Sequence, residues 1–108
     1  MATTPLSLVT IVAEPVLEPR LLKDLKELGA TGWTIVDGRG EGSRGMRASE
    51  LPGANVRVET IVTDEVAGRI IAHVAERYFP HYAVIAYVTT VAVVRGEKYA
   101  RRRSGNGS

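Results

Sequence analysis

The hydrophobic pattern along the chain predicts four strands and two helices. Short runs rich in β-branched residues, interrupted near Gly, Pro or Asp, predict strands over 6–13, 32–37, 55–63 and 82–95. In the third run, the even positions from Val56 to Val62 are Val or Thr, while Arg57 and Glu59 stand at odd positions. This alternation is typical of a strand that buries one face.

Two segments carry apolar residues at helical spacing. The apolar positions of the first are Val16, Leu17, Leu21, Leu22, Leu25 and Leu28. Pro19 fits the first turn of this helix, and Gly29 provides a natural end. The apolar positions of the second are Val66, Ala67, Ile70, Ile71, Val74, Ala75 and Tyr78. Thr63 or Asp64 can cap this helix, and Pro80 ends it.

The order β-α-β-β-α-β predicts an α+β domain of the ferredoxin-like type, an antiparallel sheet covered on one face by two helices. We expect this domain to span residues 1–99, followed by a disordered basic and polar tail over 100–108. Strand 82–95 is apolar on both alternating sets of positions, and the helices can cover only one set. This predicts that several copies pack their sheets around an axis. The alternative is that 82–95 forms two shorter strands or a bent hairpin.

Composition limits the possible functions. A chain of 108 residues without Cys forms one domain and has neither a thiol nucleophile nor a Cys-ligated metal. The pI near 9.2 suggests a nucleic-acid partner, but residues 95–103 carry five basic residues and one acid, so residues 1–94 are slightly acidic. The apolar run 6–13 is too short for a signal peptide or a membrane span, so we expect a cytoplasmic protein.

The polar stretch 38–53 is the strongest candidate for a binding site. Glycines alternate in its first half and are followed by a hydroxyl and two guanidinium groups, at Gly38, Gly40, Gly42, Ser43, Arg44 and Arg47. Glycine lets backbone N–H groups surround an anion, and arginine offers bidentate contacts to phosphate. The stretch matches neither the P-loop nor the dinucleotide-binding pattern. The alternative is a surface loop with solvated arginines.

Two segments resemble a known family. Residues 29–47, with Gly-x-Gly-Ser-Arg-x-x-Arg at 40–47, resemble the strand and T-loop start of the PII signalling superfamily, in the form of its SbtB-like branch. Residues 77–85 are similar to the second-helix end and last strand of that branch. The resemblance implies a homotrimer that binds adenine nucleotides (AMP, cyclic AMP, ADP or ATP) in clefts between subunits. It also implies a T-loop, at about 38–53, that reports the bound nucleotide to a target.

The resemblance also implies partners and site residues. The target would be a sodium-dependent bicarbonate transporter (SbtA-like), which places the protein at the membrane periphery when bound. The positions that would hold phosphate are Gly42, Ser43, Arg44 and Arg47, with Arg95 on the phosphate side. Thr34 would lie near the adenine. Glu41 stands where relatives often carry a basic residue, which should weaken triphosphate binding unless a divalent cation bridges to ATP.

The chain lacks two features that occur in some members of the family. The chain lacks Cys, and 38–53 lacks Tyr, so neither a redox-linked C-terminal loop nor a uridylylation acceptor is expected.

An RNA-binding module is the main alternative function, but such modules stack bases on aromatic side chains of their strands. Trp33 and Tyr87 could stack on adenine, yet we expect both in the core. His73 and His81 have no partner at a metal-ligand spacing, and no acid–base pair is evident, so we expect no enzyme activity.

Overall fold

The fold follows the predicted order of elements. This computed structural model describes residues 2–40 and 53–95, and for Gly40 and Gly53 it describes the backbone alone. The strands are β1 (Thr3–Ala13), β2 (Thr34–Gly40), β3 (Gly53–Val62) and β4 (Val84–Val94). The helices are the 3-10 turn η1 (Pro15–Leu17), α1 (Glu18–Leu28) and α2 (Asp64–Arg77).

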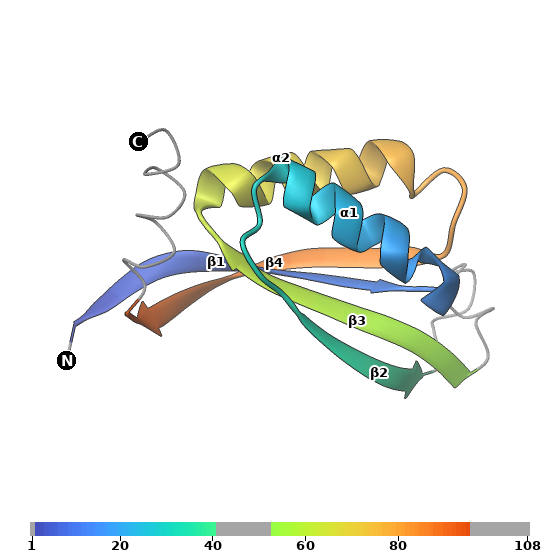
Figure 1. The fold of residues 1–108 in the computed structure, drawn as a ribbon, viewed down its shortest axis with the longest axis horizontal. Helices are drawn as coiled ribbons and strands as arrows, with labels where there is room; N and C mark the ends of the chain where they lie inside the picture. The colour runs from blue at the N-terminus through green and yellow to red at the C-terminus, as the bar shows by residue number, and fades with distance from the viewer. Residues whose placement is uncertain (1, 41–52, 96–108) are drawn as a thin grey trace.

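The strands form one antiparallel sheet with the order β2-β3-β1-β4. The first strand is central, so Val9 lies opposite Thr60 on one side and opposite Val88 on the other. Both helices lie on the same face of the sheet (Figure 1). The α+β, ferredoxin-like fold class is therefore confirmed. We call the opposite side of the sheet the uncovered face.

Local chemistry explains where the helices begin and end. Helix α1 carries Pro19 in its first turn and ends at Gly29, whose left-handed φ of 117° lets its N–H reach the carbonyls of Leu25 and Lys26. Helix α2 begins at Thr63, whose side chain accepts a hydrogen bond from the N–H of Val66 at 3.3 Å. Its first turn is acidic, which suits the positive end of the helix dipole.

The core lies between the helix layer and the sheet. Alternate residues of β1 and β3 point toward the helices and are buried, as the even-position pattern of β3 predicted. The strand residues of the core are Val9, Ile11, Ala13, Val56, Val58 and Val62. The helix residues that pack on them include Leu21, Leu25, Val66, Ile70 and Val74. Trp33 packs against this cluster, as expected.

Several details differ from the sequence prediction. Val16 belongs to η1 and is 75% exposed, because the 3-10 turn rotates it out of the apolar face of α1. Segment 82–95 contains the single strand β4 (Val84–Val94), which is slightly shorter than predicted, so the alternative of two shorter strands or a bent hairpin is wrong. Strands β2 and β3 extend through 38–40 and back to Gly53, because the backbone pairs Gly38–Asn55, Arg39–Ala54 and Gly40–Gly53 continue the ladder. The polar connection between the strands is thus 41–52, which lies outside the described residues.

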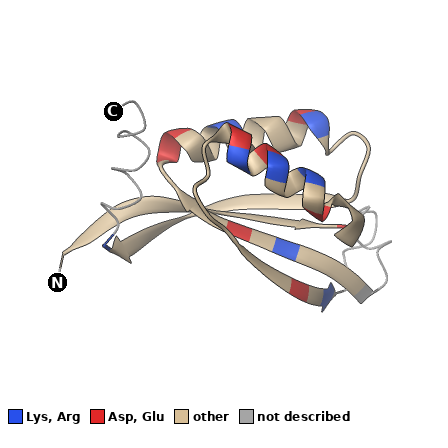
Figure 2. Cartoon of the chain, in the orientation of Figure 1, with Lys and Arg blue, Asp and Glu red and all other residues tan. Residues whose placement is uncertain are grey.

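The uncovered face is apolar over half of its width. Strand β1 carries no charged residue and β4 carries none before Arg95, whereas charges stand on β2, β3 and the helices (Figure 2). Tyr87, which lies opposite Thr10 on this face, is 47% exposed, so the expectation that Tyr87 lies in the core is wrong for the single chain. Within the described residues, no helix is long and apolar enough to cross a membrane.

Candidate functional site

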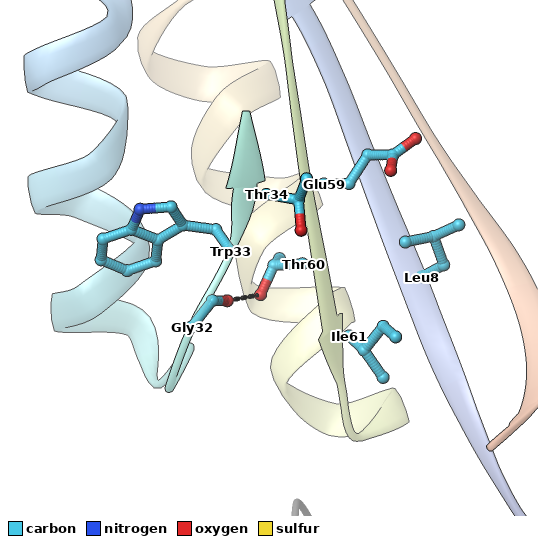
Figure 3. A pocket seen from close by; sticks show the side chains of 7 residues that line it. All are labelled: Leu8, Gly32, Trp33, Thr34, Glu59, Thr60 and Ile61. Carbon is cyan, nitrogen blue, oxygen red and sulfur yellow. Dashed lines mark hydrogen bonds between the residues drawn. The ribbon is translucent and has the colours of Figure 1, made fainter. Parts of the chain in front are cut away.

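A shallow hollow lies beside Thr34, the one adenine-side residue that the sequence predicted. It has a volume of about 220 Å³ and opens to solvent where the turn after α1 leads into β2 (Figure 3). The residues around it are Leu8, Gly32, Trp33, Thr34, Glu59, Thr60 and Ile61. The hollow therefore combines a strand start, the middle of β3 and one residue of β1.

Strand register explains how these side chains meet. Thr34 lies opposite Glu59, and Leu8 lies opposite Ile61, so all four belong to the uncovered face. Thr60 points to the other face, where its hydroxyl donates a 2.6 Å hydrogen bond to the carbonyl of Gly32. This bond holds the turn against β3. The Trp33 ring points away from Glu59, Leu8 and Ile61 (Figure 3).

The hollow has the chemistry of a small aromatic ligand site but not the volume for a whole nucleotide. Leu8 and Ile61 offer apolar contact, and the Thr34 hydroxyl and Glu59 carboxylate offer hydrogen bonds to ring nitrogens or hydroxyls. Sites that enclose drug-sized ligands usually have roughly 300–1,000 Å³. A nucleotide bound here would need further surface from outside the hollow.

A second hollow lies on the same side of the chain, next to the end of β2. It has a volume of about 310 Å³ and is lined by Val12, Val36, Asp37, Gly38, Arg39, Asn55 and Arg57. Gly38 leaves this space open, since a Cβ there would lie 3.0 Å from Oδ1 of Asn55. The Arg57 Nε lies 3.6 Å from Glu59 Oε2, an ion pair longer than a direct hydrogen bond.

Of the remaining predicted site residues, the structure describes only Arg95. Gly42, Ser43, Arg44, Arg47 and Glu41 lie in 41–52, outside the described residues. The described residues on either side of it are Gly40 and Gly53, which pair at one end of the sheet. This end lies beyond Ala13, the β1 residue that pairs with Val56 and Val84. Arg95 follows Val94, which pairs with Thr3 at the opposite end of β1, and has a left-handed φ of 65°.

Arg95 lies far from the ends of β2 and β3. At ~3.3 Å per residue, the strand lengths place Arg95 roughly 40 Å from Gly40 and Gly53. Thr34 lies at the level of Thr10, between the two ends of the sheet. Thr34 and Arg95 therefore stand at different levels of the sheet within a single chain.

A polar cluster on the helix side was missed by the sequence analysis. The Asp24 carboxylate on α1 lies 2.9 Å from Nε2 of His73 and accepts a hydrogen bond from the hydroxyl of Tyr78. Burial raises the pKa of Tyr78 above its ordinary value, and the bond to Asp24 raises it further. The hydrogen bond to Tyr82 raises the pKa of Arg20. No spacing rule links Asp24 to residues about fifty positions away, so only the packed helices reveal this cluster.

The described residues offer no metal centre. No group of three or more His, Asp or Glu side chains in 2–40 and 53–95 has a geometry that could hold a metal ion. The His73 ring bonds to Asp24. Arg95 and Thr34 are the two predicted nucleotide-site residues that the structure describes.

Comparison with known proteins places the chain in a family. A crystal structure of a Thermus thermophilus protein assigned as PII-like is 58% identical, with a TM-score of 0.79, over 92% of this chain and 99% of that chain. CPII from Thiomonas intermedia K12, bound to ADP, AMP and acetate, is 22% identical with a TM-score of 0.79, over 92% of this chain and 98% of that chain. Its form with ADP, AMP and bicarbonate is 24% identical with a TM-score of 0.73, over 86% of this chain and 97% of that chain. The family model described as nitrogen regulatory protein P-II matches residues 6–98, and the chain therefore belongs to this family.

Proposed function

We propose that this chain is a PII-like sensor of adenine nucleotides that acts as a homotrimer, with each nucleotide site built between two subunits. The observation that carries this proposal is the separation of Thr34 from Arg95 along one sheet, since Thr34 lies at the level of Thr10 and Arg95 follows Val94, which pairs with Thr3. Residues too far apart in one chain can still meet when copies pack side by side. The small volume of the hollow at Thr34 supports the same arrangement.

The uncovered face supports the trimer. Strand β4 lacks charge over Val84–Val94, and its Tyr87 side chain stands exposed on that face opposite Thr10. An uncharged strand with an exposed aromatic side chain suits an interface between copies. A chain of 108 residues also has a small core, so burial between copies would add stability.

Each predicted residue has a role in the proposed site. Thr34 contacts the adenine, and Gly42, Ser43, Arg44 and Arg47 hold the phosphates, while Arg95 of a neighbouring copy approaches the phosphate side. The effector is AMP, cyclic AMP, ADP or ATP, with a divalent cation accompanying ATP. The CPII structures with ADP and AMP support the nucleotide class, and the one with bicarbonate supports testing that ion as a co-effector.

We also propose a downstream partner. The Gly-x-Gly-Ser-Arg-x-x-Arg pattern at 40–47 favours the SbtB-like branch. In that reading the protein is cytoplasmic, acts without catalysis, and segment 41–52 docks on an SbtA-like bicarbonate transporter at the membrane. Pull-down of the transporter with and without nucleotide tests this step. Equal amounts of bound transporter in the two conditions would contradict it.

Two substitutions test the phosphate site. We expect Arg44→Ala and Arg47→Ala each to weaken AMP binding while leaving the fold intact. Loss of a hydrogen bond to a charged group costs about 1.5–3 kcal/mol, which is roughly 10- to 150-fold in affinity. Adenosine, which has no phosphate, should bind all variants similarly. Arg69→Ala is the matched control, because Arg69 lies on α2 and pairs with Glu65. Isothermal titration that finds AMP binding unchanged in both variants would reject the assignment.

A panel of ligands separates the rival functions. A thermal-shift series with AMP, cyclic AMP, ADP, ATP with and without Mg²⁺, and a short RNA should show stabilisation by nucleotides alone. Stabilisation by RNA without an effect of nucleotides would favour the RNA-binding alternative.

A further inference from the structure

The two hollows of the uncovered face are neighbours along β3. Glu59 lines the first hollow and lies opposite Thr34 of β2. Arg57 lines the second hollow and lies between Val12 of β1 and Val36 of β2. Residues two positions apart on a strand point to the same face and stand about 6.5–7 Å apart. We therefore name the two spaces the Thr34 hollow and the Arg57 hollow, with Glu59 and Arg57 at their common border.

An ion pair crosses this border. The Nε atom of Arg57 lies 3.6 Å from Oε2 of Glu59, and the two side chains are 47% and 32% exposed. A direct charge-assisted hydrogen bond would be shorter, at roughly 2.7–2.9 Å. A guanidinium has five N–H donors, and the side chains of Val12 and Val36 beside it offer no acceptor. Within the described residues, Arg57 thus keeps donors that a ligand could use.

Together the two hollows offer the space that a nucleotide needs. Their volumes are about 220 Å³ and 310 Å³, and sites for ligands of this size usually have roughly 300–1,000 Å³. The Thr34 hollow combines apolar contact with a hydroxyl and a carboxylate, which suits a base and a ribose. The Arg57 hollow combines a cation with the amide of Asn55, and Gly38 places no side chain in it. This second space suits a phosphate.

Two further charged residues line the Arg57 hollow, namely Asp37 and Arg39. Both alternate with Val36 and Gly38 along β2, so their side chains belong to the helix side of the sheet, with Ile35, which packs against the core. On the uncovered face of β2 and β3, Arg57 is therefore the cation that the structure describes. Its position next to the Thr34 hollow follows from strand register alone.

We propose that Arg57 is a phosphate-binding residue of the nucleotide site, with the base in the Thr34 hollow and the 5′-phosphate in the Arg57 hollow. In the free protein Glu59 holds the guanidinium at the border. The phosphate replaces this carboxylate with bidentate contacts, for which arginine is well suited. Glu59 is then left to accept hydrogen bonds from the base or ribose. This inference rests on the nucleotide-sensing function proposed above and adds a described residue to its site.

Arg57→Gln tests the proposal by isothermal titration with AMP and adenosine. We expect AMP affinity to fall roughly 10- to 150-fold, the range for loss of a hydrogen bond to a charged group, while adenosine affinity stays the same. Arg57→Lys keeps the charge without the planar fork and should recover part of the AMP affinity. Arg69→Gln is the matched control, because Arg69 is 46% exposed and lies 3.7 Å from Glu65, and it should change neither affinity.

Two further measurements report on the contact itself. In nuclear magnetic resonance spectra, the Nε–H signal of Arg57 should shift on addition of AMP but not of adenosine. Glu59→Gln removes the competing carboxylate and its repulsion of the phosphate, so the preference for AMP over adenosine should rise. A lower preference in this variant, or an Arg57 signal that ignores AMP, would overturn the proposal.

The remaining outcomes separate this inference from the proposed function. Equal losses of AMP and adenosine affinity in Arg57→Gln would overturn it, since they would indicate an effect on fold or assembly. Inorganic phosphate should compete with AMP, whereas phosphate that binds at Arg57 without competing would show a separate anion site and reject the nucleotide assignment. Wild-type protein that fails to bind AMP would contradict the proposed function. AMP binding that is lost in Arg44→Ala but unchanged in Arg57→Gln would reject the role of Arg57 alone.

Discussion

At the residue scale, Tyr78 shows how one side chain can satisfy two opposed requirements. Its ring is fully buried beneath the helices, yet its hydroxyl needs a partner, which Asp24 provides. Burial disfavours the phenolate, and a neighbouring carboxylate disfavours it further, so the pKa of Tyr78 is raised. The sequence placed Tyr78 on an apolar stripe, but the polar half of its role depends on α1.

This raised pKa predicts a dependence of stability on alkaline pH. Above about pH 10, the ordinary tyrosine value, the unfolded chain loses the Tyr78 proton while the folded chain keeps it. The free energy of unfolding should therefore fall as pH rises beyond 10. Urea unfolding between pH 8 and pH 11 should show a flatter decline for Tyr78→Phe than for the wild type. Identical slopes for the two proteins would contradict the raised pKa.

At the element scale, caps and strand alternation account for the element boundaries. Gly29 ends α1 in a left-handed conformation and Thr63 begins α2, so both boundaries follow from residue chemistry. The ends of β2 and β3 were harder to predict, because Gly38, Gly40 and Gly53 favour turns in isolation. Their strand conformation depends on backbone pairs with the opposite strand, which no local pattern reveals.

The cap of α2 gives a prediction at this scale. Thr63→Ala removes the side-chain acceptor for the N–H of Val66 and should lower the free energy of unfolding by about 0.5–2 kcal/mol. Thr63→Ser keeps the hydroxyl and should retain most of the stability. Denaturant titration of the three proteins measures the difference, and an equal loss in both variants would show that the methyl group, rather than the cap, carries the effect.

At the scale of the whole molecule, one face of the sheet has no helix layer over it. Half of this uncovered face lacks charge, and Thr34 and Arg95 stand at different levels along the sheet. The trimer that we propose would explain both features, because further copies would cover the face and bring these residues together. The proposed trimer therefore links stability and binding.

The trimer can be tested by mass. Light scattering at micromolar concentration should give three times the chain mass of 11.7 kDa. A stable monomer would contradict both the trimer and the intersubunit site.

One charge on β4 should disrupt both assembly and binding. Tyr87→Asp places a carboxylate on the uncovered face, where desolvating it between subunits is costly, so we expect smaller species and loss of AMP binding. Ala72→Asp puts the same charge on an exposed position of α2 and should leave mass and AMP affinity unchanged. AMP binding by a monomeric Tyr87→Asp variant would reject the intersubunit site.

Local structure and candidate chemistry could be predicted from the sequence alone. Period-two and helical spacing of apolar residues indicated the order of strands and helices, because each period depends only on neighbours along the chain. The two-sided apolar character of 82–95 indicated an uncovered face for the same reason. Glycines with Ser43, Arg44 and Arg47 marked a candidate phosphate site by residue type alone.

Which distant residues meet became clear only from the folded chain. Thr34 shares a hollow with Glu59 and Leu8 because strand register aligns them, whereas Arg95 lies at the far end of the sheet from Gly40 and Gly53. The Asp24 cluster likewise exists because α1 packs beside α2. Such contacts depend on how whole helices and strands pack against one another. Side chains about fifty positions apart share no sequence period, so no sequence pattern could predict that they meet.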